Sequence, residues 1–213
     1  MAYPTVSAPY GLKPINLIGG QVFAGATRQL PITTSSVNYN TAIFNGDVVA
    51  LTADGVVAVA TLDTDTSPVA GVVGVFLGCT YTNPVTKQLT FSQYWPGFSS
   101  GVIDAKAYVA DDPDQLYKVV NVAGATADST SSGLLPAYVG QTAVGNNAQL
   151  VLNTGSTTTG DSKTAIYLNS VTTSLPMRVV DVIPDTANSS GNFVEFVVKF
   201  NFGYHSYNNA TGV

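Results

Sequence analysis

The stretch from Gly46 to Thr61, GDVVALTADGVVAVAT, contains two Val-rich runs with Asp54 and Gly55 between them. Branched side chains favour extended backbone, and an Asp-Gly pair accepts the positive φ angles that a tight turn requires. The stretch therefore predicts a β-hairpin with strands at Val48–Thr52 and Val56–Ala60. Its clearest feature is structural, and it contains no residue pattern typical of a catalytic site.

The rest of the chain repeats this alternation of short apolar runs and turn signals. The run Val69–Cys79 is rich in Val and Gly, which predicts a buried and bent strand. Further strands are expected at Leu89–Tyr94, Ala105–Ala110, Leu116–Val122, Tyr138–Val144, Gln149–Leu152, Ala165–Leu168, Met177–Ile183 and Phe193–Phe202. Many short strands with turns about every 8 to 12 residues indicate an all-β fold, either a small β-barrel or a sandwich.

The composition limits the classes of function. Hydrophobic residues make up 45% of the 213 residues and charged residues only 10%, against roughly 25% charged residues in an ordinary soluble domain. A surface so poor in charge is typical of a protein that buries much of it against partners. The eight Lys and Arg residues are scattered singly, which argues against binding to nucleic acid. We expect no secretory signal and no membrane span, since the N-terminus lacks the required pattern and no apolar run approaches about 20 residues.

The first 42 residues differ from the rest of the chain. Four prolines interrupt this segment, and its apolar residues are spaced too irregularly for one helix or one strand. Two interpretations stay open, a loosely packed start of the domain or an extended arm that docks on a neighbouring molecule. The expected organisation is an N-terminal arm at 1–42, a barrel-like domain at 43–160, C-terminal strands or a small lobe at 161–204, and a flexible tail at 205–213.

Candidate chemical sites are few, and each has a simpler explanation. His205 is the only histidine, and without a G-x-S-x-G motif it is more easily a solvated tail residue or an interface contact than a catalytic base. The acidic run Asp111–Asp114 lacks the Gly and the closing Glu of an EF-hand loop, so it predicts a turn between strands. Cys79 lies in an apolar run and predicts a buried small hydrophobe. We expect no enzyme activity, cofactor, metal or small-molecule substrate.

Three phrases of the sequence resemble a known family. The segment AYPTVSAPYGLKPINLIGGQ, followed by RQLPI and YNTAIFNGDVVAL, covers residues 2 to about 52. The hairpin followed by PVAGVVGVFLG is the second phrase, and YVADDPDQLYKVV is the third. In this order they are similar to virion proteins of tailed bacteriophages, and the hairpin resembles the β-tulip or small-barrel pattern of capsid decoration (cement) proteins.

The resemblance implies a protein without an active site that coats the outside of a capsid, made in the host cytoplasm and assembled as a homotrimer where major capsid protein subunits meet. It leaves open another virion part, such as a head fibre or a tail component. From the apolar content of the N-terminal segment we expect an arm that binds capsid protein or a neighbouring copy. Its contact residues would be Tyr3, Tyr10, Leu12, Ile15, Leu17 and Ile18.

Overall fold

The computed structural model of the chain describes residues 6, 8–33, 41–60, 71–98, 101–124, 137–168, 174–187 and 193–210. Within these residues the chain forms twelve β-strands in two antiparallel sheets, with one α-helix and one 3-10 helix of a few residues each. The all-β prediction is confirmed. Both sheets are open, so the sandwich-like alternative agrees with the structure and a closed barrel does not.

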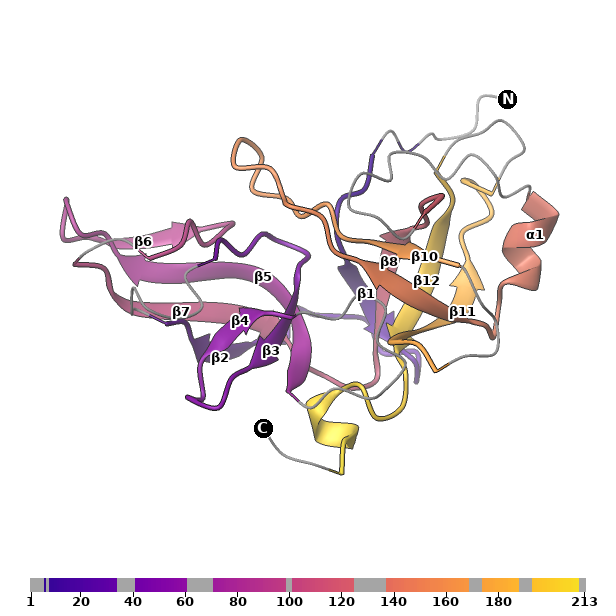
Figure 1. The fold of residues 1–213 in the computed structure, drawn as a ribbon, viewed down its shortest axis with the longest axis horizontal. Helices are drawn as coiled ribbons and strands as arrows, with labels where there is room; N and C mark the ends of the chain where they lie inside the picture. Colours follow the sequence, from indigo (N-terminus) through magenta and orange to yellow (C-terminus); the bar gives the residue numbers. More distant parts are fainter. Residues whose placement is uncertain are drawn as a thin grey trace.

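The first sheet contains the predicted hairpin and lies at one end of the molecule (Figure 1). Its strand order is β2-β7-β5-β3-β4, and β6 pairs with β5 beside this path. The strands are β2 (Arg28–Pro31), β3 (Val48–Leu51), β4 (Val57–Val59), β5 (Val72–Thr82), β6 (Leu89–Ser92) and β7 (Ile103–Ala110). The long central strand β5 contacts β3 and β6 along one edge and β7 along the other.

The second sheet lies at the other end of the molecule, with strand order β1-β8-β12-β11-β9-β10 (Figure 1). Its strands are β1 (Lys13–Leu17), β8 (Gln115–Val120), β9 (Asn147–Val151), β10 (Ala165–Tyr167), β11 (Met177–Val182) and β12 (Glu195–Phe200). The chain crosses between the sheets at 111–114, and this acidic run is the predicted turn between strands β7 and β8.

The hairpin forms as the sequence predicts, with one difference in its turn. Strands β3 and β4 pair with Val49 opposite Val59 and Leu51 opposite Val57. Gly55 has a φ of +71°, whereas Asp54 has a negative φ. The N–H of Gly55 donates to the carbonyl of Thr52. Gly55 alone therefore takes the left-handed conformation, as in the longer hairpin loops that need only one positive φ.

A shared hydrophobic core joins the two sheets. One cluster combines Val48 and Val75 of the first sheet with Tyr117 and Phe196 of the second. A second cluster lies within the first sheet around Phe76 and contains Cys79 and Trp95, both completely buried. The prediction that Cys79 is a buried small hydrophobe is confirmed. The two sheets are therefore packed on a common interior rather than merely connected by the chain.

The domain limits drawn from the sequence do not match the sheets. Strands β8 and β9 fall within 43–160, yet they pair with the C-terminal strands β12 and β11. The C-terminal strands are thus part of a sheet that begins earlier in the chain. Strands β1 and β2 fall within the segment expected to be an arm, and they pair with β8 and β7. The sheet to which each strand belongs is decided by pairing between strands that are far apart in the sequence, and local composition carries no information about that pairing.

Two further expectations are wrong. The sequence pattern predicts a strand at 138–144, but residues Ala137–Thr142 form helix α1. Gly145, three residues after the helix, has a φ of +88° and donates its N–H to the carbonyl of Val179, so the chain turns here into strand β9. The polar sequence from 205 predicts a flexible, solvated tail. Instead, His205 is completely buried and caps the 3-10 helix Ser206–Asn208. Residues 211–213 lie outside the described part of the chain.

Candidate functional site

Three distant segments meet where the two sheets join. They are 11–13 at the start of β1, 45–47 before β3, and 160–164 before β10. Backbone hydrogen bonds tie them together: Gly11 N–H to Thr164 O (3.2 Å), Leu12 N–H to Gly46 O (3.0 Å), Asn45 N–H to Gly160 O (3.0 Å) and Ser162 N–H to Asn45 O (2.9 Å). Because the backbone itself is fixed, the side chains on these segments are held close together.

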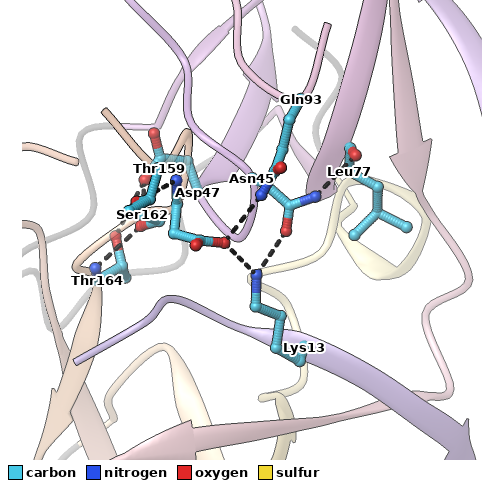
Figure 2. A network of polar contacts seen from close by, with 9 residues as sticks. Lys13, Asn45, Asp47, Leu77, Gln93, Thr159, Ser162 and Thr164 are labelled. Carbon is cyan, nitrogen blue, oxygen red and sulfur yellow. Dashed lines mark hydrogen bonds and ion pairs between the residues drawn. The ribbon is translucent and has the colours of Figure 1, made fainter. Parts of the chain in front are cut away.

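Lys13, Asn45 and Asp161 form one polar cluster at this junction. Figure 2 shows two of its members, with the amine of Lys13 directed at the amide oxygen of Asn45. The Nζ of Lys13 donates to Oδ1 of Asn45 at 2.6 Å and lies 3.1 Å from Oδ1 of Asp161. The amide nitrogen of Asn45 donates to the carbonyl of Leu77 at 2.8 Å, which orients its oxygen towards the lysine. Gln93 donates to the same carboxylate oxygen of Asp161 at 3.0 Å. The lysine amine is thereby in contact with both an amide oxygen and a carboxylate.

Asp47 is a buried acceptor beside this cluster. Its carboxylate accepts hydrogen bonds from the Phe44 N–H (2.8 Å) and the hydroxyls of Ser162 (2.5 Å) and Thr164 (3.3 Å). Burial raises the pKa of Asp47 above its ordinary value, and the three hydrogen bonds act in the opposite direction with a smaller effect. This carboxylate stabilises the junction rather than facing solvent.

A cavity of about 340 Å³ lies beside Asp47, and its walls are mostly apolar. Phe44 and Val59 line it from the side of the first sheet, and Leu152 lines it from the side of the second. Asp47 already has three donors, whereas Oδ1 of Asn153 on the same wall is buried without a hydrogen-bond partner among the described residues.

The outer face of the first sheet carries exposed apolar side chains that we call the outer-face patch, made of Leu89, Phe91 and Ile103. Leu89 and Ile103 both pair with Thr82, so their side chains lie on the same face of the sheet as that of Thr82. Phe91 is two residues after Leu89 in strand β6 and therefore points to the same face. Leu89 is 72% and Phe91 69% exposed. The ring of Phe91 lies over Gly78, which has no side chain to lift it. Strand β6, at the end of the molecule remote from the second sheet, carries most of the patch (Figure 1).

The residues predicted as arm contacts do not form one exposed surface. Tyr3 lies outside the described residues. Leu12 is completely buried in the shared core, and its side chain is engaged within its own chain. Tyr10 is half-buried and donates a hydrogen bond to Glu195. Ile15 and Leu17 are half-buried in strand β1, and Ile18 alone is well exposed, at the end of that strand.

No local sequence signal points to the polar cluster. Lys13 and Asp161 are 148 positions apart, and each is an ordinary residue in its local context. The outer-face patch does leave a signal, because the alternation Leu-Thr-Phe-Ser places Leu89 and Phe91 on one face. Whether that face is inside or outside depends on the packing of the sheet, which the alternation does not contain.

The described residues contain no group of three or more His, Cys, Asp or Glu side chains arranged to hold a metal ion. In the same part of the chain, no helix has the length and apolar character needed to cross a bilayer. No protein-family model, no curated protein and no solved structure matches the chain.

Proposed function

We propose that the chain is a structural protein of a virus particle, a capsid decoration (cement) protein of the tailed-phage type. In this proposal it binds the outer surface of the head as a homotrimer, where subunits of the major capsid protein meet, and stabilises the shell. Its function lies in its surfaces, without catalysis, a cofactor or a small-molecule substrate. The sequence resemblance of residues 2 to about 52, the hairpin and the third phrase to this family supports the choice of partner.

The observation that carries a binding role is the outer-face patch. Leu89, Phe91 and Ile103 are exposed on one face of an open sheet, with Leu89 and Ile103 on the two strands that flank Thr82 of β5. Soluble monomers rarely leave large apolar patches in water, and such patches typically mark contacts with other macromolecules. Burial stabilises a contact by about 25 cal/mol per Å² of apolar surface, reduced by the cost of association. Repetition over a whole shell multiplies even a modest contribution.

The first experiment is binding to shells that lack this protein. Purified wild-type protein is incubated with such shells, and bound protein is measured by co-sedimentation and located by cryo-electron microscopy. We expect high occupancy at the junctions of capsid subunits. Absence of wild-type protein from the shell surface contradicts the cement proposal. Density on the tail or on a head fibre instead supports the alternative virion role.

The contact itself is tested with matched surface variants. The double substitution Leu89→Ser and Phe91→Ser is expected to abolish shell binding with little effect on folding, because both side chains are exposed. Phe202→Ser is the control, since Phe202 is also an exposed aromatic but follows a strand of the second sheet. Equal loss of binding in both variants, or in neither, argues against the patch as the contact.

Within the N-terminal segment, the exposed part is the candidate arm. Deleting residues 1–20 would remove strand β1 and the buried Leu12, so the loss of binding could follow from unfolding. Ile18→Ser changes one exposed side chain at the end of β1. Weaker shell binding by this variant, at unchanged melting temperature, would support the arm; unchanged binding would leave the outer-face patch as the contact.

A further inference from the structure

We infer that Lys13 and Asn45 become joined by an intramolecular isopeptide bond, which the chain forms by itself with Asp161 as the proton-transfer group. The inference is independent of the proposed virion role. It rests on three residues, from β1 and from the loops before β3 and β10, that place an amine, a carboxamide and a carboxylate in contact.

The distances suit an attack of the amine on the amide. The Nζ of Lys13 lies 2.6 Å from Oδ1 of Asn45, and a carbonyl carbon is only about 1.2 Å from its oxygen. Attack requires Nζ to leave this hydrogen bond and move over the face of the amide onto the adjacent Cγ. The hydrogen bond from Asn45 Nδ2 to the carbonyl of Leu77 holds the amide still during this approach. The carboxylate of Asp161 lies 3.1 Å from the same Nζ.

The fold supplies the alignment that makes a poor electrophile reactive. Asn45 and Asp161 form a parallel bridge, with backbone bonds from Asn45 N–H to Gly160 O and from Ser162 N–H to Asn45 O. The Leu12 N–H donates to the carbonyl of Gly46, which fixes the residue before Lys13. Holding reactants in this way is equivalent to effective concentrations of about 10⁵ M or more in well-aligned cases.

The reaction balances without any further reactant. Asp161 takes one proton from the Lys13 ammonium, and the neutral amine attacks Cγ of Asn45 while the carbonyl electron pair moves onto Oδ1. Nδ2 faces the carbonyl of Leu77 and not Asp161, so a solvent water relays the proton from Asp161 to Nδ2, and Asp161 then receives one from the attacking nitrogen. Collapse restores the carbonyl, breaks the Cγ–Nδ2 bond and releases ammonia, which leaves with the proton held by Asp161. The products are a secondary amide and an ammonium ion.

The surroundings allow the leaving group to depart. The side chains of Lys13 and Asp161 are 32% and 39% exposed, so ammonia can pass directly into water from this site. The same exposure lets water compete for the side chains of Lys13 and Asp161, which slows the approach of the amine to the amide. We therefore expect the bond to accumulate over time in purified protein.

A competing reaction also releases ammonia and has to be separated. Asn45 precedes Gly46, and in such pairs the backbone nitrogen of the glycine can attack the asparagine side chain to form a succinimide. Here the Gly46 N–H donates to the carbonyl of Phe76 at 2.8 Å, which holds that nitrogen away from the reaction. The two products differ in connectivity, since only the isopeptide joins Lys13 to Asn45.

The test is mass spectrometry of the full-length recombinant protein, freshly purified and after several days. We expect a growing fraction lighter than the sequence by one ammonia. Trypsin cleaves after Arg28 but not between Lys13 and Pro14, and a protease that cleaves before Asp cuts at Asp47. A double digest then yields peptides 1–28 and 29–46, which a Lys13–Asn45 bond joins into one branched species. Fragmentation of that species locates the bond.

Four variants make the result specific. Lys13→Arg keeps the positive charge beside Asp161 and is expected to remove the mass loss completely, as is Asn45→Ala. Asp161→Ala is expected to slow the reaction by about 100-fold or more. Lys118→Arg is the matched control: Lys118 also pairs with a carboxylate, Glu195 at 3.1 Å, and this variant should lose ammonia like the wild type.

Two outcomes overturn the inference. One is an unchanged mass and no branched peptide in aged wild-type protein. This result is obtained on the wild type alone, so it does not depend on whether any variant folds. The other is a mass loss that persists in Lys13→Arg, which shows that the ammonia comes from another reaction, such as formation of a succinimide at Asn45. Recovery of the branched peptide in wild type and Lys118→Arg, and its absence in Lys13→Arg, establishes the bond.

Discussion

The Asp47 carboxylate accepts a 2.5 Å hydrogen bond from the hydroxyl of Ser162, a residue 115 positions further along the chain. This contact joins the loop before β3 of the first sheet to the loop before β10 of the second. It lies beside the cluster of Lys13, Asn45 and Asp161, so the junction of the two sheets is built from polar contacts at its rim and apolar packing within. Several measurable properties depend on this construction.

Replacing Asp47 is expected to change both the stability and its pH dependence. Asp47→Ala leaves three donors without their acceptor and should lower the free energy of unfolding by about 1–3 kcal/mol. The pKa of Asp47 is raised by burial above the ordinary 3.8, so the folded state binds the proton more tightly than the unfolded state. Stability from this group therefore falls as the pH rises from 3.8 through the raised pKa.

Asp47→Asn isolates that pH effect because asparagine has the same shape and does not titrate. Urea unfolding at several pH values between about 3 and 7 should show the wild type losing stability relative to Asp47→Asn as the pH increases, and then running parallel to it. Asp54→Asn, in the exposed hairpin turn, is the control for the loss of one surface carboxylate. A constant difference between wild type and Asp47→Asn at every pH would contradict the raised pKa.

His205 predicts a pH dependence in the opposite direction. Burial lowers the pKa of His205 below its ordinary 6.5, although a backbone contact with Val73 and the charges of Asp111 and Asp112 oppose this. The unfolded chain therefore binds a proton at a higher pH than the folded chain. The contribution of His205 to the free energy of unfolding is therefore fully present above pH 6.5, and it declines as the pH falls below 6.5 towards the lowered pKa. The His205→Gln variant should lack this decline when unfolding is followed from about pH 7.5 to 5.5.

The same protonation should loosen the C-terminal contact first. Tyr207 donates to Asp111 at 2.8 Å, and Arg28 lies over its ring. Hydrogen exchange of residues 203–208 is the appropriate measurement, with strand β12 as the internal reference. Equal protection of both regions at about pH 7.5 and 5.5 would show that His205 does not control the contact.

Gly74 is expected to tolerate no side chain. Its φ is +150°, and a Cβ at this position would lie 2.1 Å from the carbonyl oxygen of Ala110. Because that obstacle is backbone in the adjacent strand β7, Gly74→Ala should lower the free energy of unfolding by about 2–4 kcal/mol. Gly19→Ala is the control, since nothing lies within 4 Å and φ is not positive there. Similar melting temperatures for both variants would contradict the observed approach of the strands.

Tyr10 is expected to anchor the N-terminal segment. Its hydroxyl donates a hydrogen bond to the buried carboxylate of Glu195, and burial together with that carboxylate raises the pKa of Tyr10. Tyr10→Phe should therefore lower the free energy of unfolding by about 1–2 kcal/mol. Tyr207→Phe removes an exposed hydroxyl-to-carboxylate contact instead and should cost less. A double-mutant cycle with Glu195→Gln measures the coupling; additive effects would show that the two side chains act independently.

Much of the secondary structure could be read from short windows of sequence. The hairpin, the bent strand around Gly74 and Gly78, and strands β6 to β12 all lie within a few residues of their expected positions. The exception, helix α1, is only six residues long, and a short apolar run carries no periodicity that separates a helix from a strand. Local patterns do not predict strand β1 because Pro14 lies inside it, where its missing N–H is tolerated at the edge of the second sheet.

Short segments of the sequence are enough to predict an all-β chain, the positions of most strands and a surface poor in charge, because turn residues and side-chain branching act over a few neighbouring residues. The burial of Leu12, the exposure of Phe91 and the interior position of His205 depend instead on how the whole chain packs, and the tertiary structure set them. It also decided the meeting of Lys13, Asn45 and Asp161. Such contacts depend on which strands pair, and pairing is set by the packing of the whole chain into one core.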